Sequence, residues 1–184
     1  HADMLRRVYA ATVELTAVYA PTREHREEFA RANETTAVES VEAVIEQCDV
    51  VHVCTPASTH EAIAVQALEA DRNVVVEKPF TGYFGGGADV FSGLSFDRRE
   101  GLAAAMRSVG RMRRAEASSK GCIAYAENWV YAPAVQKERE LIEKTDAQLL
   151  WLLGEESHSG SHSPYYGIWS YSGGGSVMGK GVHP

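Results

Sequence analysis

The chain has 184 residues, of which 45% are apolar and 23% charged, ordinary values for a globular protein with a buried core. Its net charge of −7 argues against nucleic acid or an anionic membrane as a partner. No apolar run approaches the roughly 20 residues of a membrane-spanning helix, and no signal peptide opens the chain.

The first half of the chain alternates helical and apolar extended patterns. In chain order we expect a helix over 1–9, a strand over 13–20, helices over 23–32 and 41–47, a strand over 49–55, a helix to about residue 70 and a strand over 73–78. Phe29 is the expected apolar anchor of the second helix, and Ser40 the N-cap of the third. Ile63, Ala67 and Ala70 form the expected sheet-facing stripe. Short loops between alternating strands and helices indicate a parallel, doubly wound sheet.

The second half changes character after residue 80. Residues 81–97 contain five glycines and scattered aromatic residues, which predicts an irregular insertion. We then expect a helix over 98–118, a strand over 121–128, a helix from Pro133 to about residue 144 and a strand over 147–154. The tail, residues 155–184, is rich in serine, glycine, histidine and aromatic residues and is typical of loops that line a site.

Four motifs in this order resemble those of the Gfo/Idh/MocA oxidoreductases. They are Thr55-Pro56 with His60 after an apolar strand, Glu77-Lys78-Pro79 after the next strand, the strand-to-helix junction over 126–133, and Gly173-Gly174-Gly175 followed by Gly181-Val182-His183. The resemblance implies an α/β protein with a Rossmann-type doubly wound parallel sheet over 1–128. Residues 129–184 would then start a second α/β domain with an open sheet.

The resemblance also indicates what this sequence lacks. The glycine fingerprint G-x-G-x-x-G and the strand before it are absent, since His1 resembles the residue just after that turn. The sequence also ends before most of the second domain's sheet. We therefore expect a fragment of a longer protein or a truncated gene product.

The resemblance assigns the reaction centre to Lys78 and His183, with Lys180 as a further ionisable group. Lys78 would hydrogen-bond a substrate hydroxyl and the nicotinamide ribose, and His183 is a natural proton carrier near neutral pH. Glu77 would orient Lys78, contact the cofactor or pair with a neighbouring base. The family's aspartate is Gly179 here. Either the three basic residues share the acid–base work, or this branch has different chemistry or none.

The implied cofactor is NADP or NAD, and the end of the second strand favours NADP. Ala20 stands where an NAD enzyme commonly has an acidic residue, while Thr22 and Arg23 could hold a 2′-phosphate. In the alternative interpretation, Arg23 merely begins a charged helix. The other cofactor-binding candidates are Thr55, Pro56, His60, Glu77, Lys78, Pro79 and Asn128. Thr59 or His60 could instead simply start the following helix.

The substrate side is assigned to aromatic and histidine residues. Trp129 and Tyr131 would face the cleft, where Trp129 could stack on a sugar ring, unless both are domain-interface core. His158 and His162 suit substrate hydrogen bonding better than a metal, because glycine and serines argue against a helix there and no other ligand is well placed. We expect no metal site.

The sequence thus predicts an NAD(P)-dependent oxidoreductase that transfers hydride to or from a sugar, cyclitol or related polyol. The alternatives are a non-catalytic regulatory homologue that binds nucleotide or sugar, and a relative that cleaves glycosides by transient oxidation. Cys48, Cys54 and Cys122 are odd in number and lack metal-like spacing, which favours free thiols and a cytoplasmic protein. By family, we expect a homo-oligomer.

Overall fold

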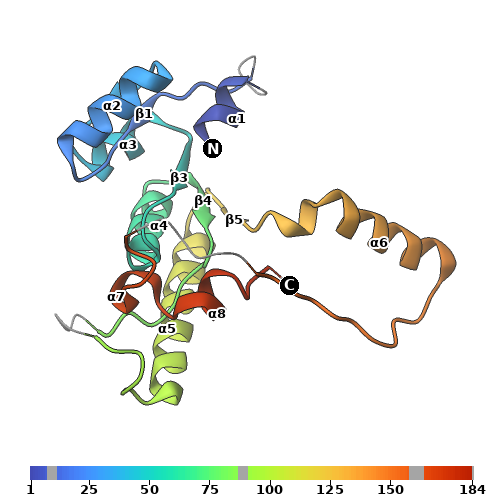
Figure 1. Cartoon of the computed structure of the whole chain (residues 1–184). Coiled ribbons are helices and arrows are strands. Elements are labelled where there is room, and N and C mark those ends of the chain that lie inside the picture. Colours follow the sequence, from blue (N-terminus) through green and yellow to red (C-terminus); the bar gives the residue numbers. More distant parts are fainter. Residues whose placement is uncertain (8–11, 87–90, 158–163, 184) are drawn as a thin grey trace. The chain divides into compact units, whose positions relative to one another are not determined.

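The computed structural model describes residues 1–7, 12–86, 91–157 and 164–183. Figure 1 follows the chain from α1 at its blue end to α8 at its red end. The chain forms two compact units. Unit 1 comprises 1–53, 62–75 and 111–124, and unit 2 comprises 54–61, 76–110 and 125–184. Both units are described separately below.

Unit 1 begins with alternating helices and short strands. Its first elements are α1 (Ala2–Arg7), β1 (Ala17–Val18), α2 (Arg23–Asn33), β2 (Thr36–Ala37), α3 (Val41–Gln47) and β3 (Val50–Val53). β1 and β2 pair in parallel, with Ala17 opposite Thr36. The strand expected over 13–20 is therefore only two residues long, because Val13 and Glu14 at its start are exposed to solvent.

The next elements are η1 (Ala57–Thr59), α4 (His60–Glu69), β4 (Asn73–Glu77), α5 (Arg98–Ser118) and β5 (Ile123–Ala126). Strands β3, β4 and β5 form a second sheet in that order. In unit 1 the backbone N–H of Asn73 donates to Asp49 O at 3.1 Å, and that of Val74 donates to Cys122 O at 2.9 Å. Strands joined through helices in this way form the expected α/β, Rossmann-type fold.

The core of unit 1 follows the pleat of the strands and one face of α4. Val51 and Val53 alternate inward on β3, and Val74 is buried on β4. The part of α4 that belongs to unit 1 buries the apolar residues Ala64, Ala67 and Leu68, spaced as one helical face requires. The expected stripe was right about Ala67 and wrong about Ala70, which is exposed at the end of the helix.

Helix α2 buries a different face from the one expected. Phe29 is 38% exposed, whereas Arg26 and Ala30 are buried. The Arg26 guanidinium donates to the Glu39 carboxylate and to Ala20 O. These partners allow a charged side chain to be buried, because a carboxylate and a carbonyl accept from its two terminal nitrogens, while Nε is buried without a partner among the described residues. Apolar anchoring of α2 by Phe29 was therefore wrong.

The N-cap at Ser40 is confirmed, and it supplies a stability test. Its hydroxyl oxygen accepts from the Ala43 N–H at 3.2 Å. Replacing Ser40 with alanine should lower the free energy of unfolding by about 1 kcal/mol, measured by urea denaturation. Thr22 caps α2 without a side-chain hydrogen bond, so Thr22→Ala is the matched control. Equal losses in both variants would contradict a specific role for the Ser40 hydroxyl.

In unit 2 the irregular character expected for 81–97 is confirmed over the described part, which contains no helix or strand. Aromatic rings order this segment instead. Tyr83 and Phe91 contact edge to face with centroids 5.2 Å apart, and Phe96 contacts Trp169 of α7 (Trp169–Ser172) at 6.4 Å. Phe91 and Phe96 therefore hold α7 within unit 2 by packing on Trp169.

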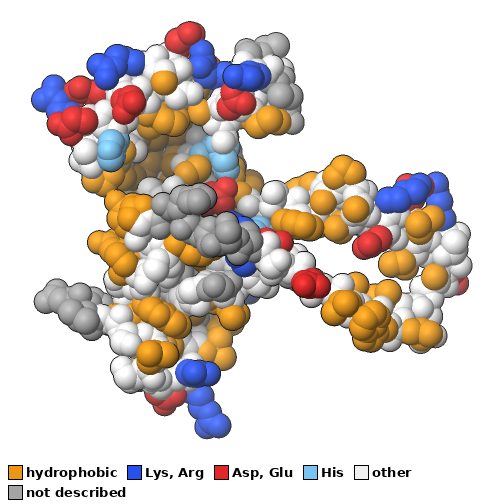
Figure 2. Space-filling model, viewed as in Figure 1, with side chains coloured by type: hydrophobic (Ala, Val, Ile, Leu, Met, Phe, Trp, Pro, Cys, Tyr) orange, Lys and Arg blue, Asp and Glu red, His pale blue; other side chains and the backbone are white. Residues whose placement is uncertain are grey.

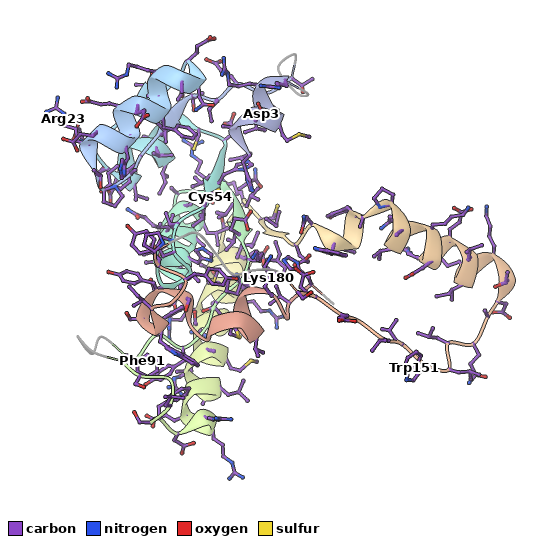
Figure 3. All side chains as sticks on the ribbon, in the orientation of Figure 1. Asp3, Arg23, Cys54, Phe91, Trp151 and Lys180 are labelled. Carbon is purple, nitrogen blue, oxygen red and sulfur yellow. The ribbon has the colours of Figure 1, made fainter. Side chains whose placement is uncertain are left out.

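The strand expected over 147–154 is not formed. Helix α6 (Pro133–Thr145) begins at its proline as expected, but the residues after it pair with no strand in the described chain. Leu150 is 86% exposed and Trp151, labelled in Figure 3, is 75% exposed. Figure 2 shows hydrophobic side chains gathered over α6 and this segment. The apolar pattern was real, but a strand also needs a partner to satisfy its backbone.

Among the described helices, none combines the length and apolar character needed to cross a bilayer.

Candidate active site

The candidate site lies in unit 2, where β4 and β5 end. Lys78 directly follows β4, and Glu127 directly follows β5. Both residues lie at the carboxyl ends of strands, which is where α/β sheets bind ligands. The ammonium of Lys78 donates to Gly179 O at 2.8 Å, and its backbone N–H donates to the Glu77 carboxylate at 2.9 Å. Lys78 is thereby held against the last residue of α8 (Gly175–Gly179).

Three consecutive glycines direct the chain from α7 into α8. Gly173, Gly174 and Gly175 have φ values of 72°, 156° and 63°, conformations that residues with a side chain rarely adopt. A Cβ at Gly173 would also lie 2.6 Å from the Phe84 ring. This turn sets the direction of α8, and so places the Gly179 carbonyl that Lys78 contacts.

His183 is held by a carboxylate. Its Nδ1 lies 2.9 Å from Glu127 Oε1, and the two side chains are only 6% and 16% exposed. Burial opposes ionisation of Glu127, but the Trp129 N–H, His183 and the charge of Lys78 together keep its pKa below the ordinary value. Because ionised Glu127 can only accept, Nδ1 must carry the proton of this bond. A neutral His183 then keeps a lone pair on Nε2 and can accept a proton there.

Glu127 was missed by the sequence analysis, although a signal for it existed. It follows an apolar strand directly, as Lys78 does, and the ends of two neighbouring parallel strands lie at the same edge of a sheet. One of its oxygens, Oε2, is buried and has no hydrogen-bond partner among the described residues. A buried carboxylate oxygen without a partner is uncommon, which favours a ligand-binding role for this end of the sheet.

The remaining predicted catalytic and substrate residues differ in their surroundings. Lys180, labelled in Figure 3, lies with its ammonium 3.5 Å from Glu156. The Trp129 ring lies near that of His183, with centroids 6.0 Å apart, while Asn128 and Tyr131 are exposed. The structure thus brings Trp129 to His183 and pairs Lys180 with a different carboxylate. His158 and His162 lie outside the described residues.

His60 is fully buried and joins two turns of the site. Its Nδ1 lies 3.1 Å from Pro79 O and its Nε2 lies 2.9 Å from Thr55 O. Both ring nitrogens therefore face backbone carbonyls. The Thr59 hydroxyl donates to the Thr55 hydroxyl at 2.6 Å. This geometry favours a structural role for His60, which ties the turn after β3 to the Glu77-Lys78-Pro79 turn.

Replacing His60 with alanine should lower the free energy of unfolding by about 3 kcal/mol, because it leaves a cavity and removes a hydrogen bond from a buried carbonyl. Chemical denaturation measures the effect. His25→Ala is the control, since His25 is exposed on α2 and should change stability by less than about 0.5 kcal/mol. An unchanged stability of the His60 variant would refute the structural role.

Thr22 and Arg23 lie in unit 1, at the start of α2. Arg23 Nε donates to Glu27 Oε1 at 2.7 Å, and this hydrogen bond raises the pKa of the guanidinium. Both side chains remain largely accessible to solvent. Arg23 is thus a helix-start residue in an exposed i, i+4 pair, which leaves its guanidinium able to exchange partners at little cost.

The polar groups of unit 2 fit the ribose and nicotinamide end of a dinucleotide. Lys78 offers an ammonium at a strand end, Glu77 offers a carboxylate beside it, and Glu127 has a buried oxygen without a partner in the described chain. Such donors and acceptors suit sugar hydroxyls and a carboxamide. Within the described residues, no group of three or more histidine, cysteine, aspartate or glutamate side chains is placed to hold a metal.

Comparisons with known proteins also indicate a fold that binds a nicotinamide dinucleotide. The Gfo/Idh/MocA family, an oxidoreductase family with an NAD-binding Rossmann fold, matches residues 2–91. UDP-N-acetylglucosamine 3-dehydrogenase of Acidithiobacillus ferrooxidans is 38% identical over 73 residues, which are 40% of this chain and 23% of that protein.

Solved structures that match over the whole chain include the following two. GenD2 from gentamicin A biosynthesis, in complex with NAD, is 26% identical with a TM-score of 0.68, and 47% of it is covered. The WlbA dehydrogenase from Bordetella pertussis, in complex with NADH and UDP-GlcNAcA, has a TM-score of 0.74 at 17% identity, and 48% of it is covered. The second likeness concerns the fold alone. The chain spans less than half the length of these relatives.

Proposed function

Because residues 2–91 match the Gfo/Idh/MocA family of oxidoreductases, we propose that the protein belongs to this family and is a dehydrogenase acting on a sugar-like alcohol or ketone. The observation that carries the proposal is the pairing at the two strand ends. Lys78 is held against Gly179, and His183 is held by Glu127 in the same unit. A cation and an oriented imidazole are the groups that proton transfer at a carbon–oxygen bond needs.

The chain's own residues would do the following. Bound nicotinamide dinucleotide would supply or accept the hydride. Lys78 would hydrogen-bond the reacting oxygen and stabilise negative charge on it. His183 would accept the hydroxyl proton at Nε2 in the oxidation direction, while Glu127 holds the ring and stabilises the imidazolium that forms.

The substrate proposed is a sugar attached to a nucleotide. The relative from Acidithiobacillus ferrooxidans is named for a UDP-linked sugar, and it shares 38% identity over its matched region. Trp129 supports this class, because its ring lies beside His183 and could stack against a sugar face. NADP is proposed over NAD on the strength of Arg23, whose exposed guanidinium could exchange Glu27 for a 2′-phosphate.

The test is a screen for NAD(P)H formation with UDP-N-acetylglucosamine, free polyols and a glycoside as substrates. Oxidation of a sugar nucleotide or polyol supports the proposal, and release of an aglycone would favour the glycoside-cleaving alternative. Cofactor binding without turnover would favour a regulatory protein, an alternative suggested by Gly179, which contributes no carboxylate. For the cofactor, Arg23→Ala should raise KM for NADP and leave that for NAD unchanged.

A further inference from the structure

The side-chain space of residue 179 is filled by another residue. Gly179 ends α8 and is buried. A Cβ placed on it would lie 1.7 Å from the hydroxyl oxygen of Tyr166 and 2.3 Å from the ring carbon that carries this hydroxyl. No side chain at 179 can coexist with Tyr166 in this position. The tyrosine hydroxyl therefore occupies the place of a polar group carried by position 179 itself.

The Tyr166 hydroxyl has an unusual environment. It is buried and has no hydrogen-bond partner among the described residues. Burying a hydroxyl without a partner costs on the order of 1–3 kcal/mol, so proteins rarely keep one without a reason. Burial also raises the pKa of this phenol, which keeps its proton in place at neutral pH. The Tyr166 hydroxyl is thus a protonated hydrogen-bond donor that has no acceptor among the described residues.

The surroundings of this hydroxyl belong to the proposed reaction centre. The Gly179 residue that it overlies presents its carbonyl to the Lys78 ammonium at 2.8 Å. Lys78 in turn lies close enough to Glu127 to influence its ionisation. Residue 179 thus links the phenol to the cation, and both belong to unit 2.

We propose that the Tyr166 hydroxyl is a catalytic proton donor, which contacts the reacting oxygen of the substrate from the space that a side chain at residue 179 would fill. This inference rests on the proposed dehydrogenase function. It adds to Lys78 and His183 a third group, from a segment that the sequence analysis assigned only to loops.

The proton balance defines its step. In the reduction direction, the carbonyl carbon of the substrate accepts a hydride from the reduced nicotinamide dinucleotide. The carbonyl oxygen takes the proton of the Tyr166 hydroxyl, which yields the alcohol and a phenolate. The phenolate regains its proton through water from the imidazolium of His183, so the same proton returns to Nε2 when the reaction runs in the oxidation direction. Lys78 stabilises the negative charge, first on the substrate oxygen and then on the phenolate.

The first arm of the test measures placement without activity. Gly179→Ala should destabilise the protein in the wild-type background and cost far less in a Tyr166→Ala background, measured by thermal unfolding. Tyr166→Phe should leave the melting temperature unchanged or raised, because it removes a buried hydroxyl without a partner. Equal costs of Gly179→Ala in both backgrounds would show that Tyr166 lies elsewhere, and would overturn the inference.

The second arm measures ketone reduction. Tyr166→Phe should lower kcat at least about 100-fold with little change in cofactor Kd, which is within the usual range for loss of a general acid. Tyr165→Phe is the matched control, because Tyr165 is exposed and packs on Tyr171. Combining Tyr166→Ala with Gly179→Asp should recover at least about tenfold in kcat over Tyr166→Ala alone, since alanine removes the ring that fills the space of a side chain at 179 and the carboxyl returns a group that carries a proton.

The two proposals fail in different ways. A wild-type enzyme that turns over while Tyr166→Phe retains full kcat would overturn the role of Tyr166 and leave the dehydrogenase function intact. A wild-type protein that binds cofactor and converts no alcohol or ketone would overturn the dehydrogenase function, and the proton-donor role with it. In that case the unfolding measurements still decide where the Tyr166 hydroxyl lies.

Discussion

Replacing Lys78 with methionine is expected to lower kcat by about 1,000-fold, the largest loss among the variants described here. Methionine keeps the length and much of the apolar stem of lysine but removes the ammonium that stabilises charge on the reacting oxygen. The donor to Gly179 O is lost at the same time. Steady-state kinetics with saturating cofactor measure the effect.

The control for this variant is Lys120→Met. Lys120 has an 88% exposed side chain that pairs with Asp71 in unit 1. Its replacement should leave kcat within about twofold of wild type. Both proteins should unfold at similar temperatures, so that a lost rate cannot be attributed to a lost fold. A Lys78→Met enzyme with more than about a tenth of the wild-type kcat would exclude Lys78 from the chemistry.

Replacing Glu127 with glutamine is expected to lower kcat by about 100-fold or more. The amide has nearly the same shape but no charge, so it neither enforces the proton on His183 Nδ1 nor stabilises the imidazolium. Substrate KM should change little, because the substitution alters a group behind the imidazole. Glu138→Gln is the control, because Glu138 is exposed on α6, and this substitution should leave kcat unchanged.

The Glu127→Gln substitution should also change how the free energy of unfolding depends on pH. The pKa of Glu127 is lower in the folded protein than its ordinary value of 4.5, so the folded state binds fewer protons than the unfolded state in this range. Its stabilising contribution is therefore present above about pH 4.5 and is lost as the pH falls through the folded pKa. Glu127→Gln should flatten this acid-side loss. An identical pH profile in both proteins would contradict the hydrogen bond between Glu127 and His183.

Local signals in the sequence predicted most elements well. Helix α5 spans 98–118 as expected, Pro133 begins α6, and Ser40 caps α3. Each depends on residues within one or two turns of the chain. The strand over 147–154 failed because hydrophobicity indicates only that a segment could be buried, whereas pairing requires a partner that lies elsewhere.

The candidate site likewise contains residues that local sequence predicts and contacts that only the fold determines. A lysine after an apolar strand could be singled out from neighbouring residues alone. Its contact with Gly179, 101 positions away, and that of His183 with Glu127, 56 positions away, depend on how unit 2 folds. Tyr166 could not be singled out, since no sequence pattern indicates that a tyrosine thirteen positions earlier fills the space beside a glycine.

The division of the chain into two units has a genetic consequence. The chain passes between the units at 53/54, 61/62, 75/76, 110/111 and 124/125, so that β4, β5, α4 and α5 each contribute residues to both. No single cut in the polypeptide releases one unit whole, and a continuous deletion that removes all of one unit also removes parts of the other. Truncation alleles within residues 54–124 should therefore behave as complete losses, whereas point substitutions can separate folding from chemistry.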